Sequence, residues 1–201
     1  MPIEIEKKYR LTPKQRRAIE RRMLDMSLVP GELEHEENTI YRGGSLDQPG
    51  RALRLRRVNG RRAFLTFKQR RPGSSPIKHQ EEHEVVVADA DVMDRILGRL
   101  NFRPGLVYEK RRTRWEVGKA KVVIDELPFG LFMEIEAPVR EIKRVERIIG
   151  AANLPAVMET YPSLTRLLGK EKRGVIEARF VSEARPSGRA ASAKRTAAKK
   201  R

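Results

Sequence analysis

Residues 51–70 read RALRLRRVNGRRAFLTFKQR, and this stretch decides the fold. Two runs, at about 51–58 and 61–70, alternate apolar and charged side chains with the period of a β-strand. The dipeptide Asn59-Gly60 between them is the strongest short signal for a β-hairpin. The stretch therefore predicts two antiparallel strands, with apolar side chains on one face and Arg54 and Arg56 on the other.

The same alternation recurs in both directions from this hairpin. It predicts further strands at about 2–10, 37–42, 77–88, 105–117, 119–127 and 130–138, which makes eight. Helical patterns interrupt the strands after Thr12, after Asp89, over 140–152 and over 163–169. The helix after Asp89 carries an apolar stripe that we expect to be buried, consisting of Val92, Ile96, Leu97 and Leu100.

Charged side chains of both signs share one face of these strands. A single pair such as Arg54-x-Arg56 usually lies on the solvated face of a sheet, but here six strands repeat the pattern. If the eight strands close into a barrel, that face lines an enclosed lumen. The lumen would hold seven carboxylates, Glu4, Glu6, Glu82, Glu84, Asp125, Glu134 and Glu136, and seven cations, Lys8, Arg54, Arg56, Lys68, Lys110, Arg112 and Arg114.

Such a lumen cannot be an ordinary core, because burying many ionised groups is costly unless they are paired or bind ions. Carboxylates two residues apart on a strand can converge on Mg²⁺ or Mn²⁺, hard cations that prefer oxygen ligands. Guanidinium and ammonium groups on facing strands suit a chain of phosphates. The pattern indicates a polyphosphate ligand carried with a divalent metal. The fold class that we expect is α+β, an eight-stranded antiparallel β-barrel (tunnel) with flanking α-helices.

Composition narrows the class further. The chain of 201 residues has 44 Lys and Arg against 27 Asp and Glu, a formal net charge of +17. The lack of cysteine excludes disulfides, thiolate metal sites and cysteine nucleophiles. There is no apolar run approaching the roughly 18 residues of a membrane span, and the acidic, strand-like start lacks the features of a signal peptide. We expect a cytoplasmic protein, monomeric or homodimeric, that does not bind membranes.

We expect one domain over residues 1–169, followed by a basic, disordered tail over 170–201. From residue 184 onward the chain has seven cations and no acid. Solubility is the simplest role for such a tail, and nonspecific contact with nucleic acid or another polyanion is the alternative. A separate acidic cluster, Glu32, Glu34, Glu36 and Glu37, is interpreted as a solvated loop.

Several short motifs follow one another in a characteristic order. They are Glu4-x-Glu6-x-Lys8, Ala52-Leu53-Arg54-Leu55-Arg56, Leu65-Thr66-Phe67-Lys68, Glu81-Glu82-His83-Glu84, Lys110-x-Arg112-x-x-Trp115, Ile124-Asp125-Glu126 and Glu134-Ile135-Glu136. Together they resemble the CYTH superfamily, the triphosphate tunnel metalloenzymes, which include class IV adenylate cyclases, thiamine triphosphatases and inorganic triphosphatases. The resemblance covers about residues 1–169.

The resemblance implies a role for each matching residue. Glu4, Glu6, Asp125, Glu134 and Glu136 match metal ligands, with Glu82 and Glu84 as an assisting acidic pair. Lys8, Arg54, Arg56, Lys68, Lys110 and Arg112 match phosphate-binding cations. The family often has Asp-x-Tyr-Phe-Asp-Thr where this chain has Asn38-Thr39-Ile40-Tyr41-Arg42, which is a departure. Tyr41 would fill the aromatic position from which a tyrosine–lysine pair with Lys68 activates water, and a shift of one residue would turn it to the other face.

Three functions share this tunnel. The first is metal-dependent hydrolysis of a triphosphate: inorganic triphosphate, thiamine triphosphate or a nucleoside triphosphate. The second is a class IV adenylate cyclase, which makes cyclic AMP and pyrophosphate from ATP. The third is a catalytically silent polyphosphate or nucleotide binder. We expect the hydrolase, because all the acids of the metal-binding pattern are present, but the phosphate-binding residues alone do not choose the substrate.

Overall fold

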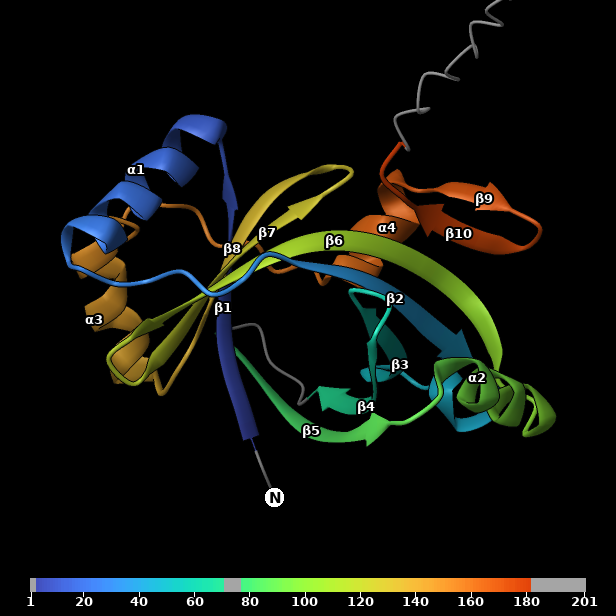
Figure 1. Ribbon diagram of the computed structural model, residues 1–201. Helices are drawn as coiled ribbons and strands as arrows, with labels where there is room; N and C mark the ends of the chain where they lie inside the picture. Colours follow the sequence, from blue (N-terminus) through green and yellow to red (C-terminus); the bar gives the residue numbers. More distant parts are fainter. Residues whose placement is uncertain (1–2, 71–76, 182–201) are drawn as a thin grey trace, which may run out of the picture.

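The computed structural model describes residues 3–70 and 77–181. Its centre is a closed, antiparallel, eight-stranded β-barrel with helices packed outside it and at one end (Figure 1). The strands are β1 (Ile3–Leu11), β2 (Glu34–Arg42), β3 (Arg51–Val58), β4 (Arg62–Arg70), β5 (Ile77–Val87), β6 (Arg103–Val117), β7 (Ala120–Leu127) and β8 (Gly130–Glu136). Their order is β2-β3-β4-β5-β1-β8-β7-β6, and pairing of β2 with β6 closes the barrel. The predicted fold class is confirmed.

The β3–β4 hairpin forms where the sequence predicts it. Asn59 and Gly60 take positive φ angles of 51° and 63°, as the two central residues of a tight hairpin turn require. The register then places Arg56 opposite Phe64 and Arg54 opposite Thr66. Because side chains alternate across a strand, this register directs both arginines into the barrel and Leu55 outward.

Apolar cores lie on the outside of the barrel, beneath the helices. Helices α1 (Pro13–Asp25) and α3 (Val139–Ile149) cover one side (Figure 1) and pack on a core that includes Trp115, which is 3% exposed. Thr12 caps α1, as predicted, through reciprocal hydrogen bonds with Gln15. Trp115 therefore packs outside the barrel and does not face the lumen.

Helix α2 (Ala90–Arg99) packs over a second outer core with one narrow face. Its N-cap is Asp89, as predicted, and Leu97 is buried. Val92, Ile96 and Leu100 are 39%, 46% and 60% exposed, so the expected buried stripe is wrong for these three. The reason is geometric, because α2 touches the barrel through the side that carries Met93 and Leu97. A 3-10 turn, η1 (Gly44–Asp47), joins β2 to β3 and adds Leu46 to this core.

Helix α4 (Tyr161–Leu168) closes one end of the barrel. Its Tyr161 and Leu164 pack with Leu106, Tyr108 and Phe132, whose positions in β6 and β8 belong to the inward-facing set. This apolar cluster ends the charged lumen on that side. The lumen is therefore a pocket open toward the other end.

The chain continues in the sheet beyond α4. Strands β9 (Lys170–Lys172) and β10 (Val175–Ala178) form a hairpin, and β10 pairs in parallel with β6. The expected tail boundary at residue 169 is therefore wrong for 170–178, because backbone pairing with an open edge of β6 orders this segment. The tail prediction for 182–201 lies outside the described residues.

Across 3–70 and 77–181, the helices all lack the combined length and apolar character that crossing a membrane needs.

Candidate active site

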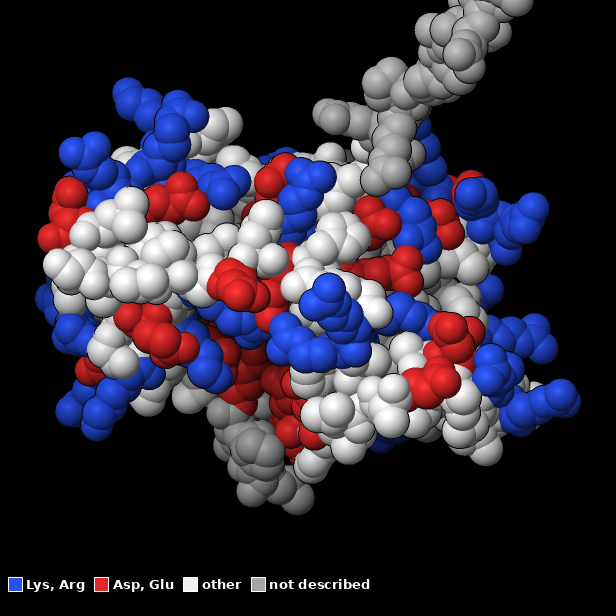
Figure 2. All heavy atoms as spheres, viewed as in Figure 1, with Lys and Arg blue, Asp and Glu red and all other residues white. Residues whose placement is uncertain are grey.

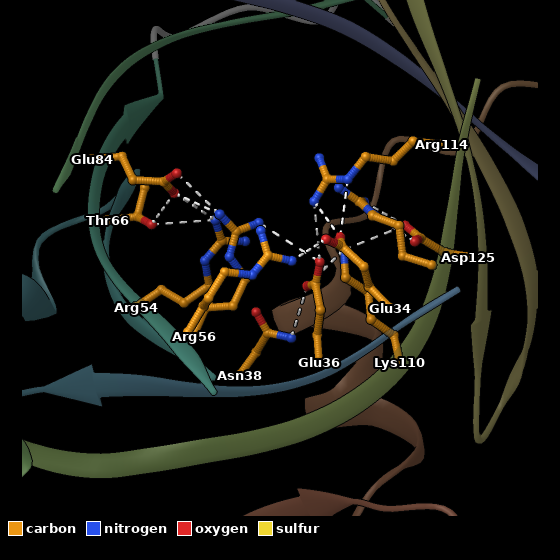
Figure 3. Close-up of polar contacts among 12 residues, drawn as sticks. Glu34, Glu36, Asn38, Arg54, Arg56, Thr66, Glu84, Lys110, Arg114 and Asp125 are labelled. Atoms are coloured by element: carbon orange, nitrogen blue, oxygen red, sulfur yellow. Dashed lines mark hydrogen bonds and ion pairs between the residues drawn. The ribbon is translucent and has the colours of Figure 1, made fainter. Parts of the chain in front are cut away.

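Charged side chains from the inward faces of the strands meet in the lumen. Figure 3 shows Arg54, Arg56, Glu36 and Lys110 converging inside the curve of the barrel from β3, β2 and β6. Figure 2 shows carboxylates lining a hollow of the surface near the start of β1. The inward face of each strand is therefore charged, as the alternation predicts.

The β3 arginines meet the β5 carboxylate Glu84. Nη2 of Arg56 donates to both carboxylate oxygens of Glu84, at 3.0 and 2.9 Å. Arg54 donates to the hydroxyl of Thr66 at 3.3 Å, and that hydroxyl donates to Glu84 at 2.7 Å. Arg56 is 7% exposed, so its guanidinium is held in place by these contacts. Arg54 and Arg56 thus present two planar guanidinium groups, and this donor geometry matches the oxygens of a phosphate group.

Glu36 occupies the centre of the cation cluster, and the sequence interpretation missed it. Its side chain is fully buried, 3.3 Å from Nζ of Lys110 and 3.7 Å from Nη1 of Arg56. Burial by itself would raise the pKa of Glu36, but Lys110, Arg112 and Arg56 together hold it far below its usual range. Glu34 from the same strand accepts two bonds from Arg114, at 3.0 and 2.7 Å.

The solvated-loop interpretation is therefore wrong for Glu34 and Glu36. Strand β2 starts at Glu34 and not at residue 37, so both side chains belong to the inward-facing set with Asn38. The signal was present as a period of two through Glu34, Glu36 and Asn38. A run of acidic residues before a strand is equally typical of a solvated loop. The sequence alone does not fix the first residue of the strand, because that depends on the strands with which it pairs.

A second network surrounds Asp125 on β7. Arg112 donates to both oxygens of Asp125, at 2.6 and 2.5 Å, and to Glu134 at 2.8 Å. The hydroxyl of Tyr161 donates to Asp125 at 2.8 Å. Nζ of Lys8 lies 3.3 Å from Glu134 and 3.7 Å from the centre of the Tyr161 ring. Helix α4 thus contributes a residue to the site that no strand pattern could reveal.

Lys110 is the most deeply buried cation of this network. Its exposed fraction is 1%, and Nζ lies 3.5 Å from Asp125 and 3.3 Å from Glu36. Burial and the neighbouring Arg112 lower the pKa of Lys110 and nearby carboxylates oppose the change, so that the pKa falls to about 8. The charge of Lys110 is therefore sensitive to its surroundings.

The acidic part of the lumen lies around Glu4. Nζ of Lys68 donates to Glu4 at 2.6 Å and lies 3.0 Å from Glu82. Burial raises the pKa of Glu4, and a hydrogen bond to the neighbouring Glu82 raises it again. Glu4, Glu6, Glu134 and Glu136 also line a cavity of about 40 Å³, whose rim includes the cations Arg112, Arg114 and Lys121. A water needs about 10–15 Å³, so this space has room for a small hydrated ion.

These carboxylates fit a divalent metal by their chemistry. They are oxygen donors gathered around one cavity, and a hard cation there would neutralise their negative charge. Across 3–70 and 77–181, no three carboxylates or histidines yet close around one point as a metal's ligands would. Several instead turn toward lumen cations: Glu134 lies 2.8 Å from Arg112, and Glu136 lies 3.4 Å from Lys121.

Tyr41 does not face the lumen, so its predicted place beside Lys68 is wrong. Its ring is 3% exposed, packs in the outer core with Leu55 and Leu97, and its hydroxyl donates to Asp94 on α2. The register explains this, because Ile40 and not Tyr41 pairs with the inward-facing Arg54. Burial and the contact with Asp94 raise the pKa of Tyr41, which removes it further from a role as a base.

Comparison with known proteins agrees with this geometry. The family model of the CYTH domain matches residues 2–153. The chain belongs to the CYTH family. The matched stretch contains the eight barrel strands and ends before α4, so β9 and β10 are additions beyond the CYTH region.

Solved structures share the CYTH fold with this chain. The PH1012 protein from Pyrococcus horikoshii OT3 is 22% identical, with a TM-score of 0.69 over 80% of this chain and 98% of that one. The PH1819 protein from the same organism is 24% identical, with a TM-score of 0.66 over 80% and 97%. HpAC1 from Hippeastrum, a candidate adenylyl cyclase described as having a dominant triphosphatase activity, is 16% identical, with a TM-score of 0.60 over 80% and 93%. A search of curated proteins found no match.

Proposed function

We propose that this protein hydrolyses a triphosphate within the barrel lumen, with the help of Mg²⁺ or Mn²⁺. The observation that carries the proposal is the division of one lumen into two parts. Buried cations fixed on paired strands lie next to a cavity lined by Glu4, Glu6, Glu134 and Glu136. A phosphate chain that carries a divalent cation complements these charges, because its anionic oxygens pair with the lumen cations and its metal pairs with the carboxylates.

In this proposal, the cations bind the phosphate chain. Arg54, Arg56 and Lys68 come from β3 and β4, and Lys110 and Arg112 come from β6 on the other side of β2. Their ion pairs with carboxylates orient the donors before the ligand arrives, so little reorganisation is needed on binding. The same cations stabilise charge that develops on the phosphate oxygens during transfer.

We assign the metal to Glu4, Glu6, Glu134 and Glu136. Glu84 accepts two bonds from Arg56 and Asp125 two from Arg112, and neither lines that cavity, so we assign these two to orienting the arginines. The divalent metal supplies neutralisation of phosphate charge and a bound water of lowered pKa. HpAC1, the plant neighbour of similar fold, is described with a triphosphatase activity, which supports hydrolysis over cyclisation.

Product analysis tests the proposal. The protein with Mg²⁺ or Mn²⁺ is given inorganic triphosphate, thiamine triphosphate and ATP in turn, and the products are separated by ion-exchange chromatography. Release of orthophosphate from at least one of them is expected. Cyclic AMP with pyrophosphate from ATP would assign the chain to the cyclases. Tight binding without turnover of any of the three would make it a silent binder.

A matched pair of arginine variants links turnover to the lumen. Arg56→Ala removes a donor inside the barrel, whereas Arg57→Ala removes the next residue, which faces outward and contacts Asp91 at 2.7 Å. We expect kcat/KM to fall about hundredfold or more for Arg56→Ala, since a charge-assisted phosphate contact is lost. Arg57→Ala should retain most of the activity. Equal losses in the two variants would contradict catalysis in the lumen.

A further inference from the structure

The segment after α4 lies beside the seam between β2 and β6 where the barrel closes. Residues 170–178 form the β9–β10 hairpin, and β10 pairs in parallel with residues 106–108 of β6. Arg179 and Phe180 then contact residues of β2 and β6. Nothing in this segment belongs to the stretch that matches the CYTH model.

Arg179 bridges the two strands of that seam from outside. Its guanidinium Nη1 donates to Glu37 on β2 at 2.5 Å and to Glu109 on β6 at 3.1 Å. The next residue, Phe180, donates its backbone N–H to Glu109 at 2.8 Å, and its ring lies 4.3 Å from the guanidinium carbon of Arg111. Four contacts therefore fix residues 179 and 180 to the seam.

Glu37 and Glu109 are opposite one another in the register of β2 and β6. Like charges directly opposite on antiparallel strands repel, and Arg179 is the cation that neutralises both. Glu37 has a second, longer contact of 3.8 Å with Arg57, and Glu109 lies 4.0 Å from Nε2 of His35. The first of these contacts joins β2 to β3, and the second, from His35 on β2, spans the seam at a longer distance than either contact of Arg179.

The inner side of the same seam carries the core of the site. Glu36 and Lys110, each one residue from the outer pair, are register partners 3.3 Å apart in the lumen. Because neighbouring residues of a strand point to opposite faces, separating Glu37 from Glu109 would also separate Glu36 from Lys110. The outer pair, Glu37 and Glu109, and the inner pair, Glu36 and Lys110, therefore depend on the same pairing of β2 with β6.

We propose that the C-terminal segment is a clamp on the tunnel seam, and that Arg179 is a positioning residue for the lumen cation Lys110. Arg179 holds β2 against β6 by neutralising the opposed carboxylates Glu37 and Glu109. The expected effect of Arg179 on triphosphate affinity rests on the proposed function, whereas its expected effect on the pairing of β2 with β6 does not.

The variants separate charge neutralisation from packing. Arg179→Ala leaves the two carboxylates facing one another, and Lys172→Ala removes an exposed cation of β9 as a matched control. A triple variant, Arg179→Ala with Glu37→Gln and Glu109→Gln, lacks the clamp cation but also lacks the repulsion. Hydrogen exchange of the amides at 35–38 and 108–111 reports on the seam, and calorimetric titration with inorganic triphosphate reports on the lumen.

We expect Arg179→Ala to speed exchange at the seam and to weaken triphosphate binding, each about fivefold. Lys172→Ala should match the parent protein in both measurements. The triple variant should recover most of both losses, because the repulsion that opens the seam is gone.

The outcomes distinguish the clamp from the proposed function. If the parent protein binds no triphosphate, the proposed function fails while exchange still tests the clamp. Unchanged exchange in Arg179→Ala would overturn the clamp, and faster exchange with unchanged affinity would overturn its link to Lys110. Failure of the triple variant to recover would show that Arg179 acts by packing alone, which also overturns the proposal.

Discussion

Oε2 of Glu36 lies 3.3 Å from Nζ of Lys110, and both side chains are buried at the centre of the lumen. A buried ion pair contributes little net stability, because desolvation of the two charges offsets their attraction. The role of this ion pair is to position the neighbouring side chains. Glu36 keeps the cations Lys110 and Arg56 in place when no anionic ligand separates them, which prepares the lumen to receive phosphate.

Replacement of Glu36 should therefore destabilise the fold. Glu36→Gln leaves buried cations without their central anion, and we expect the free energy of unfolding at pH 7 to fall by about 3–5 kcal/mol. The folded-state pKa of Glu36 is lowered, so its stabilisation is present above its unfolded value of 4.5 and is lost as the pH falls. Urea unfolding at pH 7 and pH 4 measures both effects. Glu32→Gln, an exposed acid before β2, is the control, and equal stability of the two variants would contradict this account.

The affinity for a phosphate chain should depend on the charge of Lys110. Because its pKa is lowered to about 8, we expect triphosphate binding to weaken as the pH rises above 8. Stability should change in the opposite sense and rise between pH 8 and the unfolded value of 10.5, since the unfolded chain then binds more protons. Calorimetric titrations from pH 6.5 to 9.5 measure the affinity.

The matched variant is Lys110→Arg, whose guanidinium stays charged over this range. Both proteins experience the same ionisation of the ligand, so the difference between their profiles isolates the lysine. Superimposable profiles would show that Lys110 keeps its charge above pH 8.

Metal dependence should trace to the acidic cavity. Glu134→Gln removes an anionic ligand with almost no change of volume, and turnover should fall by about two orders of magnitude or more. Chelation with EDTA should abolish turnover of the parent protein, and added Mn²⁺ should restore it. Binding of Mn²⁺, followed by electron paramagnetic resonance, should weaken in Glu134→Gln and not in Glu126→Gln, an acid of β7 that contacts the outward-facing Arg111 at 3.3 Å. Activity that survives EDTA would exclude the metal assignment.

Tyr41 should be dispensable for turnover. Tyr41→Phe loses the hydroxyl contact with Asp94 outside the barrel, so we expect a stability loss of about 1 kcal/mol and an unchanged kcat. Lys68→Met removes a lumen cation 2.6 Å from Glu4 and should lower kcat/KM severely. Thermal melts and steady-state kinetics of the two variants provide the measurements. A large loss of kcat in Tyr41→Phe would place its hydroxyl at the reacting phosphate after all.

The sequence predicted the barrel through its alternation. Asn59-Gly60 set the β3–β4 turn, and the period of two placed Arg54, Arg56 and Lys68 on one face. Such inferences succeed because side-chain direction in a strand depends only on local backbone geometry. They failed for Tyr41, where one residue of register exchanges the two faces, and register is set by the partner strand.

The sequence by itself determined the class of the fold, the charged face and most residues of the lumen. Only the tertiary structure decided where β2 begins, which brought Glu34 and Glu36 inside, and only it brought Tyr161 from α4 against Asp125. It also placed Arg179 across Glu37 and Glu109, which are 142 and 70 residues away in the chain. Contacts of this kind join segments with no local pattern in common, and closure of the barrel is what creates them.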